Sequence, residues 1–277
     1  MTPIFLIAVK EFRDGMRNRW VIAITVLLAV FALTLSFLGS APTGAVKTSP
    51  LAVTVVSLSS LTIFLVPLIA LLLSYDAIVG EIDRGTMALL LSYPVARHEV
   101  IIGKYLGHLG ILSIATMIGY GFAGVLSQWA TSGDFQLDTW MPFFALIGSS
   151  ILLGACFLAM GYLISTCVRE RATAAGIAIG VWLFFVLIYD MALLGALVAD
   201  QGRYLTSDMI GWLLLLNPTD AYRLINLTGF TETAQFSGMA GLTEQAQSSI
   251  SVLIATLLIW TALPFGAAAA LFHRKQI

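Results

Sequence analysis

The chain has 277 residues, of which 59% are hydrophobic and only 10% are charged, and its formal net charge is -1. An average soluble domain has about 25% charged residues, so this composition excludes an ordinary soluble protein and indicates a membrane protein. The lipid bilayer is therefore an expected partner, and nucleic acid is not.

Six runs of the sequence are long and apolar enough to cross a bilayer, which takes about 20 residues at ~1.5 Å rise each. They are residues 20–38, 53–75, 105–127, 142–166, 172–199 and 249–272. The strands of a membrane barrel alternate in hydrophobicity over about ten residues, and these runs do not. The sequence therefore predicts an all-α, polytopic membrane protein with six transmembrane helices in a single domain, residues 1–277.

The Lys and Arg residues predict the orientation, because the cytoplasmic side of a membrane protein accumulates them. Eleven of the 14 fall on one side of the predicted spans and three on the other: Lys10, Arg13, Arg17, Arg19, Arg84, Arg97, Lys104, Arg169, Arg171, Arg274 and Lys275 against Lys47, Arg203 and Arg223. Both termini are therefore predicted to be cytoplasmic, with the protein in the cell inner membrane. The first run has full spanning length and follows four basic residues, so we expect a retained anchor rather than a cleaved signal.

Residues 1–19 form the first predicted element. Ile4, Ile7, Ala8, Phe12 and Met16 fall near three-and-four spacing, which is typical of an amphipathic helix that lies in the membrane interface. The alternative is a charged tail that only sets the topology.

The stretch of residues 80–104, "GEIDRGTMALLLSYPVARHEVIIGK", separates the second and third spans. Asp83 can cap a helix and Pro94 ends it, which predicts a helix about 15 Å long over residues 84–93. Its apolar side chains share one side and would be exposed to the cytoplasm: Met87, Leu90 and Leu91. Such a helix either lies in the groove of a partner or dips into the lipid headgroups.

The outer segment, residues 200–248, is too long for a simple connector. In "NPTDAYRLINL", Asn217 can cap a helix, Pro218 suits its first position and Asp220 faces the positive end of its dipole. The expected buried stripe of this helix is Ala221, Leu224 and Ile225.

Two interpretations of this outer segment stay open, a lid on the helix bundle and a docking surface for an extracytoplasmic partner. The candidate docking residues are Asn217, Asp220, Tyr222 and Arg223.

The sequence contains no sign of an enzyme. The one Gly-Lys pair, Gly103-Lys104, is followed by Tyr105 and does not form a phosphate loop, so the chain is not expected to bind ATP itself. The three histidines fall near the cytoplasmic side and serines such as Ser149 toward the other, which excludes a Ser-His pair for intramembrane proteolysis. The two cysteines lie on one helix about 16 Å apart, too far for a disulfide.

Three residues within the spans are candidates for a transport pathway. Asp190 is a carboxylate in the fifth span, where it costs about 3 kcal/mol and normally faces the bundle interior. Cys156 and Met160 lie four residues apart and share a helix face, which fits either a copper path or ordinary packing. Neither pattern assigns a metal site.

The 80–104 stretch resembles the signature of ABC-2 type permeases, the membrane subunits of ABC transporters. In that family Glu-x-x-Arg-Gly-Thr, a short leucine-rich helix, Pro, Arg and a later Gly-Lys recur between the second and third spans. The resemblance covers essentially the whole chain. It implies a cytoplasmic ATPase partner, which would bind the ATP and Mg, and no cofactor in this chain. The implied ATPase-coupling residues are Glu81, Arg84, Gly85, Thr86, Met87, Leu90, Leu91 and Arg97.

Within that family the chain resembles the permeases of complexes that mature nitrous oxide reductase, notably over "YDAIVGEIDRGTMALLLSYPVARHEVIIGKYLG" and "LNPTDAYRLINLTGF". The resemblance implies a homodimer and an extracytoplasmic β-helical partner that handles copper. The expected function is export of a small sulfur species, or mechanical switching of that partner, during copper-site assembly. The alternatives are an ion-coupled secondary carrier and a passive membrane scaffold.

Overall fold

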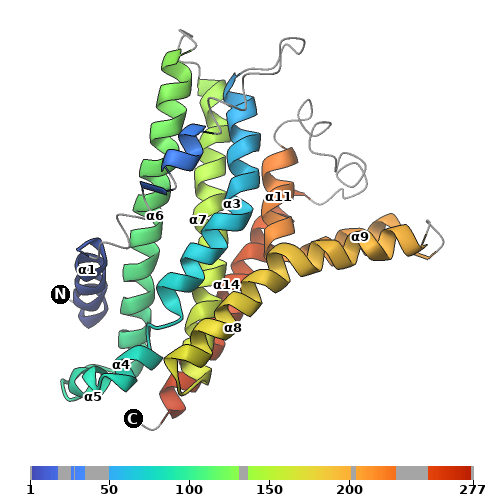
Figure 1. Ribbon diagram of the computed structural model, residues 1–277. Coiled ribbons are helices and arrows are strands. Elements are labelled where there is room, and N and C mark those ends of the chain that lie inside the picture. Colours follow the sequence, from blue (N-terminus) through green and yellow to red (C-terminus); the bar gives the residue numbers. More distant parts are fainter. Residues whose placement is uncertain are drawn as a thin grey trace.

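The computed structural model describes residues 2–17, 26–27, 29–34, 50–130, 137–200, 204–228 and 249–275, and these residues form helices and turns without a strand (Figure 1). In chain order the described helices are α1 (Pro3–Met16), α3 (Pro50–Ser74), α4 (Val79–Asp83), α5 (Thr86–Leu91), α6 (Arg97–Ala130), α7 (Leu137–Cys167), α8 (Arg171–Leu183), the π-helix η1 (Phe184–Ile188), α9 (Tyr189–Asp200), α10 (Ser207–Leu215), α11 (Pro218–Thr228) and α14 (Ile250–Arg274). The predicted all-α class is confirmed for this part of the chain.

Among the described residues, five helical stretches are long and apolar enough to cross a membrane: Ser57–Asp83, Arg97–Leu126, Trp140–Cys167, Arg171–Asp200 and Ile250–Arg274. They coincide with the second to sixth predicted spans. The first predicted span, residues 20–38, lies largely outside the described residues. The chain is therefore a multi-pass membrane protein.

Helix α7 lies at the centre of the bundle and packs against α3, α6 and α14 (Figure 1). Three of its large apolar side chains, Phe143, Leu153 and Phe157, are fully buried between these neighbours. Because a spanning helix satisfies its own backbone hydrogen bonds, side-chain packing and a few interhelical bonds set how these helices associate.

Helix α1 packs along α6 instead of standing apart from the bundle (Figure 1). Two glycines of α6 allow the close approach: a Cβ at Gly103 would lie 2.9 Å from Ile4 O, and one at Gly107 would lie 2.9 Å from Ala8 O. Of the predicted apolar face of α1, Ile7 is buried against α6 and Ile4, Ala8 and Phe12 are partly buried, whereas Met16 is exposed. The apolar side chains that α1 leaves exposed are Phe5, Leu6, Val9 and Met16.

The fifth span is one helical rod with a π-helical turn at its middle, α8–η1–α9, and its α9 end extends away from the bundle (Figure 1). Within α9 only Leu193 is buried. A π turn inserts one residue and frees backbone groups for other partners, and it recurs at functional sites.

The outer segment contains α10 and α11, and α11 packs against α3, α7 and α14. Its predicted cap is confirmed, and two of the three residues of its predicted stripe are buried, while the third, Ile225, is partly buried. Asn217 Oδ1 accepts a hydrogen bond from Thr219 N at 3.0 Å, and Ala221 and Leu224 are buried. Residues 201–203 and 229–248 of the predicted segment lie outside the described residues.

Candidate coupling site

The helix predicted over residues 84–93 is the shorter helix α5, Thr86–Leu91, and another short helix, α4, precedes it at the end of the second span. Gly85 separates them with a φ of +71°, in the left-handed region that glycine adopts at least cost. Asp83 is therefore the last residue of α4, and Gly85, not Asp83, takes the cap position of α5. The left-handed turn lets α5 leave the direction of α4.

The apolar face predicted for this helix points inward. Met87 is fully buried, and Leu90 and Leu91 are partly buried against the core, so the prediction of an exposed patch made of these three residues is wrong. The exposed apolar side chains of the segment are Leu89, at 65% exposure, and Tyr93, at 62%. Spacing identified a face of the helix correctly, but it could not say which face the bundle covers.

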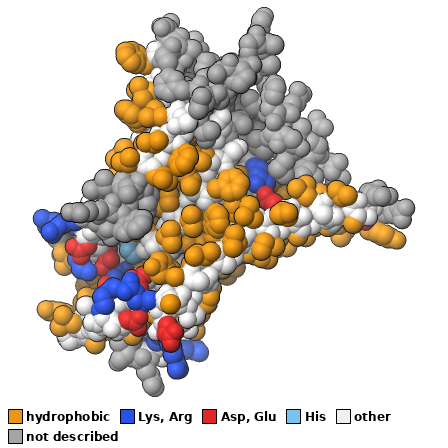
Figure 2. All heavy atoms as spheres, in the orientation of Figure 1, with side chains coloured by type: hydrophobic (Ala, Val, Ile, Leu, Met, Phe, Trp, Pro, Cys, Tyr) orange, Lys and Arg blue, Asp and Glu red, His pale blue; other side chains and the backbone are white. Residues whose placement is uncertain are grey.

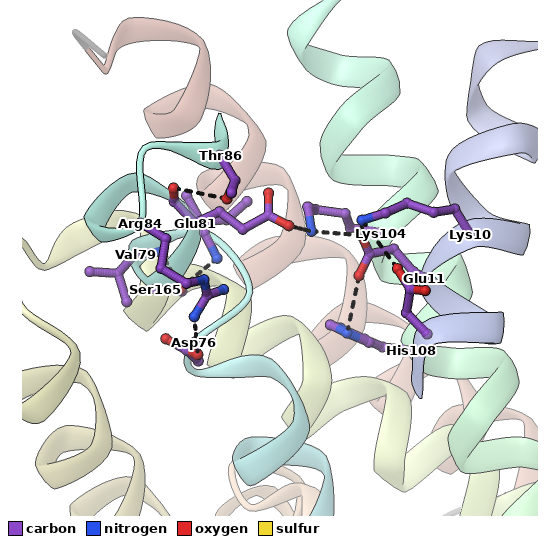
Figure 3. Close-up of polar contacts among 12 residues, drawn as sticks. Lys10, Glu11, Asp76, Val79, Glu81, Arg84, Thr86, Lys104, His108 and Ser165 are labelled. Carbon is purple, nitrogen blue, oxygen red and sulfur yellow. Dashed lines mark hydrogen bonds and ion pairs between the residues drawn. The ribbon is translucent and has the colours of Figure 1, made fainter. Parts of the chain in front are cut away.

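Backbone hydrogen bonds tie this segment to the centre of the bundle (Figure 3). Ile78 N and Val79 N both donate to Ser165 Oγ of α7, each at 3.0 Å. Thr86 Oγ1 donates to Glu81 O at 3.2 Å and links α5 back to α4. Ser165 is fully buried, so the start of α4 is fixed to α7 at a site that water does not reach.

Asp76, just after α3, joins the segment to the fifth span. Arg171 holds its carboxylate with two bonds of 2.7 Å, and Arg84 approaches it at 3.5 Å. The two-pronged arginine contact fixes both distance and direction. Arg84 was predicted to face a partner; its side chain is half exposed and leans toward Asp76 (Figure 3).

A second ion-pair cluster centres on Lys104 of α6. Its ammonium lies 2.9 Å from Glu11 Oε1 of α1 and 2.7 Å from Glu81 Oε1 of α4 (Figure 3). Lys104 is only 1% exposed, and the described residues provide no hydrogen bond to the buried Glu81 Oε2. Glu81, a predicted ATPase-coupling residue, therefore points into the protein.

The electrostatics of Glu11 follow from this cluster. Burial by itself raises the pKa of the Glu11 carboxyl, but the attraction and hydrogen bond of Lys104 outweigh burial and lower that pKa to about 2. Lys10 and His108 add to the same effect. Glu11 is thus a carboxylate at neutral pH and a charged partner for α6.

Arg97, also predicted to couple to an ATPase, binds the end of another helix. Its Nη1 donates to Phe272 O at 3.1 Å and to His273 O at 3.4 Å, and it also contacts Lys275 O. Lys275 Nζ in turn donates to Thr166 O and Val168 O at the end of α7, each at 2.9 Å. These cations satisfy C-terminal carbonyls that a helix leaves without partners.

The predicted docking and pathway residues at the other end come together in one cluster. Arg223 contacts Asp220 Oδ1 and Asp190 Oδ2, both at 2.8 Å, and Asn217 Nδ2 donates to Asp220 Oδ2 at 3.0 Å. Asn217, Asp220 and Tyr222 are buried, so these three side chains do not form an exposed docking surface. Asp190 has Arg223 as its counter-charge.

The other pathway candidates pack between helices. Cys156 is fully buried, and its Sγ donates to Leu152 O at 3.2 Å and to Leu257 O of α14 at 3.1 Å. Met160 is 6% exposed in the same core. Among the described residues, no three His, Cys, Asp or Glu side chains gather closely enough to hold a metal ion. Packing accounts for both side chains.

Sequence reasoning missed the inward ion pairs. No pairing role was given to Asp76, Glu11 or Ser165 from the sequence, and Lys104 and Arg171 served only as basic residues that predict the orientation, with Lys104 also as part of a Gly-Lys pair. The sequence feature that could have identified them is a charged or hydroxyl side chain close to the predicted membrane boundary of an otherwise apolar chain. Such residues are expected to pair, because an unpaired charge near lipid is costly.

Comparison with known proteins decides the family. A family model described as "ABC-2 family transporter protein" matches residues 5–277. The chain belongs to the ABC-2 family. It is 45% identical over 278 residues to a protein of Pseudomonas aeruginosa, with 100% of both chains covered. It is also 44% identical over 275 residues to one of Stutzerimonas stutzeri, with 99% of each covered. Both relatives are named "Probable ABC transporter permease protein NosY".

Membership of the ABC-2 family confirms the resemblance read from residues 80–104. The chain is a permease-type membrane subunit of an ABC transporter, and this role implies a cytoplasmic ATPase partner. In this permease the family motif divides into two sets. Glu81, Met87 and Arg97 fix the segment to the bundle, whereas Leu89 and Tyr93 are exposed beside it.

Proposed function

We propose that this permease receives the motion of its partner ATPase through α5, with Leu89 and Tyr93 as apolar contacts and Arg84 beside them. The partner would bind ATP and Mg, and this chain would supply no catalytic residue. The observation that carries the proposal is the exposure of two large apolar side chains on a short helix whose other face is buried. Charged side chains gather around this end of the molecule, where a soluble partner meets water rather than lipid (Figure 2).

The way α5 is anchored supports a mechanical role. Its buried Met87, the Ser165 hydrogen bonds at the start of α4 and the Asp76 ion pairs leave the segment few ways to move alone. A displacement imposed on α5 would therefore be carried into α3, α7 and α8 as packed rigid bodies. The displacement would be transmitted by packed contacts that shift together, and no catalytic group is needed for it.

The test compares two substitutions at one exposed position. Leu89→Asp places a charge in the proposed contact, whereas Leu89→Met keeps its size and apolar character. We expect the partner ATPase to copurify with wild type and Leu89→Met but not with Leu89→Asp. The stimulated ATPase activity should likewise be retained with wild type and Leu89→Met and lost with Leu89→Asp. If the ATPase copurifies with Leu89→Asp as well as it does with wild type, Leu89 does not contact the ATPase.

We further propose that the work done is part of nitrous oxide reductase copper-site maturation. The support is the sequence resemblance together with full-length identity of 44% and 45% to two permeases named NosY. The permease would either export a small sulfur species or switch an extracytoplasmic β-helical copper-handling protein. Replacing the native permease with variants in a nitrous oxide-respiring host tests this, with the copper content of the reductase as the readout.

Two rival functions give different results in the same system. A passive scaffold predicts full copper loading even when the partner ATPase cannot hydrolyse ATP. An ion-coupled carrier predicts gradient-driven flux in liposomes without the ATPase, abolished by Asp190→Asn. The ion pair between Asp190 and Arg223 disfavours the carrier, because the carboxylate already has a protein counter-charge.

The proposed orientation places both termini and α5 in the cytoplasm, and α11 at the outer side of the cell inner membrane. The excess of Lys and Arg at the α5 end supports it. A reporter that is active only in the cytoplasm should be active when it is fused after Lys275, and one that is active only outside the cytoplasm should be inactive there.

A homodimer is proposed through α8. Ala172, Gly176 and Gly180 lie four residues apart and are exposed, and an added Cβ at either glycine would meet no atom within 4 Å. Small residues at this spacing let two membrane helices approach closely. Gly176→Leu should reduce crosslinking between copies, whereas Gly266→Leu, on an equally open position of α14, should not.

A further inference from the structure

Lys104 is the point at which three separate elements meet. It belongs to α6, and its ammonium binds Glu11 of α1 and Glu81 of α4 at 2.9 and 2.7 Å (Figure 3). Glu11 and Glu81 lie 70 positions apart in the sequence, so no local interaction places them together. One buried cation therefore connects the N-terminal helix to the segment that precedes α5.

The packing around Lys104 makes this connection stiff. One face of α1 lies against Gly103 and Gly107 of α6, so closely that a Cβ at Gly107 would come within 2.6 Å of Glu11 Cβ. This contact fixes α1 to α6 on the side that carries Lys104. The bond to Glu81 then adds α4, whose start is already held by Ser165.

The attraction between the Lys104 ammonium and the two carboxylates holds α1 and α4 toward each other. The side chains of Glu11 and Glu81 are 11% and 13% exposed, so water screens them little. With Lys104 present, both carboxylates are drawn to one ammonium and α1 is held toward α4. Without it, two buried carboxylates would face a site with no central counter-charge, which is strongly unfavourable.

We propose that Lys104 is a positioning residue that makes α1, α6 and α4 move as one body. The inference rests on the proposed function: when the partner ATPase displaces α5, Lys104 carries that displacement to α1 in addition to the α3 and α7 route. The N-terminal helix is thereby a moving part of the permease and not only an anchor for its topology.

The experiment measures the distance between spin labels on α1 and beside α5. Labels are placed at Val9→Cys and Ser92→Cys, both exposed positions, in a full-length chain in which the exposed Cys167 is changed to Ser. The labelled chain is diluted with unlabelled chain so that only the distance within one copy is seen, and the complex with its ATPase is measured without nucleotide and with a non-hydrolysable ATP analogue. We expect one narrow distance that is the same in both states.

Lys104→Met is the test variant, and Lys10→Met is its matched control. Lys10 also contacts Glu11, at 3.0 Å, but its side chain is 58% exposed and its ion pairs among the described residues are with Glu11 and Asp14 of its own helix. We expect Lys104→Met to broaden the distance and make it depend on nucleotide, and Lys10→Met to leave it unchanged. Lys104→Arg keeps a cation beside both carboxylates and should restore the narrow distance.

A neutral triple variant separates positioning from stability. Glu11→Gln, Glu81→Gln and Lys104→Met together remove the buried repulsion, so the thermal unfolding temperature should recover most of the loss seen with Lys104→Met alone. The distance should nevertheless remain broad, because the ionic connection is absent. A narrow distance in Lys104→Met, or in the triple variant, would overturn the proposal.

The two proposals fail in different ways. Failure of the ATPase contact appears as unchanged copurification with Leu89→Asp. The nucleotide-free distance does not depend on ATPase binding, so it tests the Lys104 connection even in that case.

Discussion

Arg223 Nη2 lies 2.8 Å from Asp190 Oδ2, and this ion pair joins α11 to the fifth span immediately after its π-helical turn. The same turn presents Phe185 O, which accepts from Asn217 Nδ2 at 3.0 Å and from Thr219 Oγ1 at 3.3 Å. A π turn needs outside partners for the backbone groups it frees. The N-terminal end of α11 supplies them, so the turn and the carboxylate in the span have one structural explanation.

Breaking the pair from one side is expected to destabilise the protein. Arg223→Met would leave Asp190 and Asp220 without their shared cation, and loss of one partner of a buried pair costs about 3–5 kcal/mol. Because both side chains of the pair retain about a fifth of their exposure, we expect about 2–3 kcal/mol, measured as the free energy of unfolding in detergent.

The control for this prediction is the variant Asp190→Asn combined with Arg223→Met. It removes one carboxylate together with the cation, and it should unfold at a higher temperature than Arg223→Met alone. If the single and combined variants lose equal stability, Asp190 and Arg223 do not act as a pair.

The outer helix shows how much local sequence can predict. Asn217, Pro218 and the stripe of Ala221 and Leu224 are local signals, and α11 begins and buries its side chains as they indicate. The pairing of Arg223 with Asp190 was not predicted, because the two residues are 33 positions apart and composition does not show which helices are neighbours. The spans are also predictable from local sequence, because each is a continuous apolar run. Which helices pack against one another depends on tertiary structure and is not.

The coupling segment shows the opposite case. The motif located it correctly between two spans, yet the helix start and the exposed face were both wrong. Asp83 is a good cap by residue type, but Gly85 alone readily adopts the left-handed backbone that the turn requires. Met87 is buried because α5 packs against the bundle. The short apolar run of α5 is compatible with burial and with partner contact, so the sequence could not decide between them.

The turn at Gly85 predicts a backbone-specific effect. Gly85→Ala meets no steric obstacle, because a Cβ there would find no atom within 4 Å, so its cost comes from the positive φ and should be about 1–2 kcal/mol. We expect weaker copurification of the partner ATPase. Gly85→Asn should lose less, because asparagine tolerates this conformation, and equal losses for both variants would contradict the explanation.

The contact between α1 and α6 predicts a strong position dependence among glycines of one helix. Gly107→Val should displace α1 and cost about 1–3 kcal/mol, because the added atoms meet the α1 backbone at 2.9 Å. Gly121→Ala, on the same helix with no atom within 4 Å, should be neutral or slightly stabilising. Thermal unfolding and protease cleavage within α1 measure the difference. Similar behaviour of the two variants would mean that α1 is not held by this face.

Ser165 predicts a hydrogen-bond effect at the start of α4. Ser165→Ala leaves the buried Ile78 N and Val79 N without their acceptor and should cost about 1–3 kcal/mol. Ser113→Ala is the control, because Ser113 Oγ donates to Leu109 O of its own helix and joins no second element among the described residues. Hydrogen exchange at residues 78–79 should increase in the first variant alone. Unchanged exchange there would show that Ser165 does not hold the segment.

Glu11 predicts how stability depends on pH. Its folded pKa, about 2, lies below its ordinary value of 4.5, so its carboxylate contributes stability that is fully present above pH 4.5 and is lost as pH falls toward 2. The folded and ordinary pKa values differ by about 2.5, so at 1.36 kcal/mol for each pKa unit the contribution is about 3 kcal/mol. Glu11→Gln should therefore unfold more easily than wild type at neutral pH, and the difference should shrink steadily between pH 4.5 and about 2. Asp14→Asn is the control, because Asp14 is exposed and its ion pair within the described part of the chain is with Lys10, at 3.5 Å. A difference for Glu11→Gln that stays constant over this range would show that Lys104 does not hold the Glu11 carboxylate.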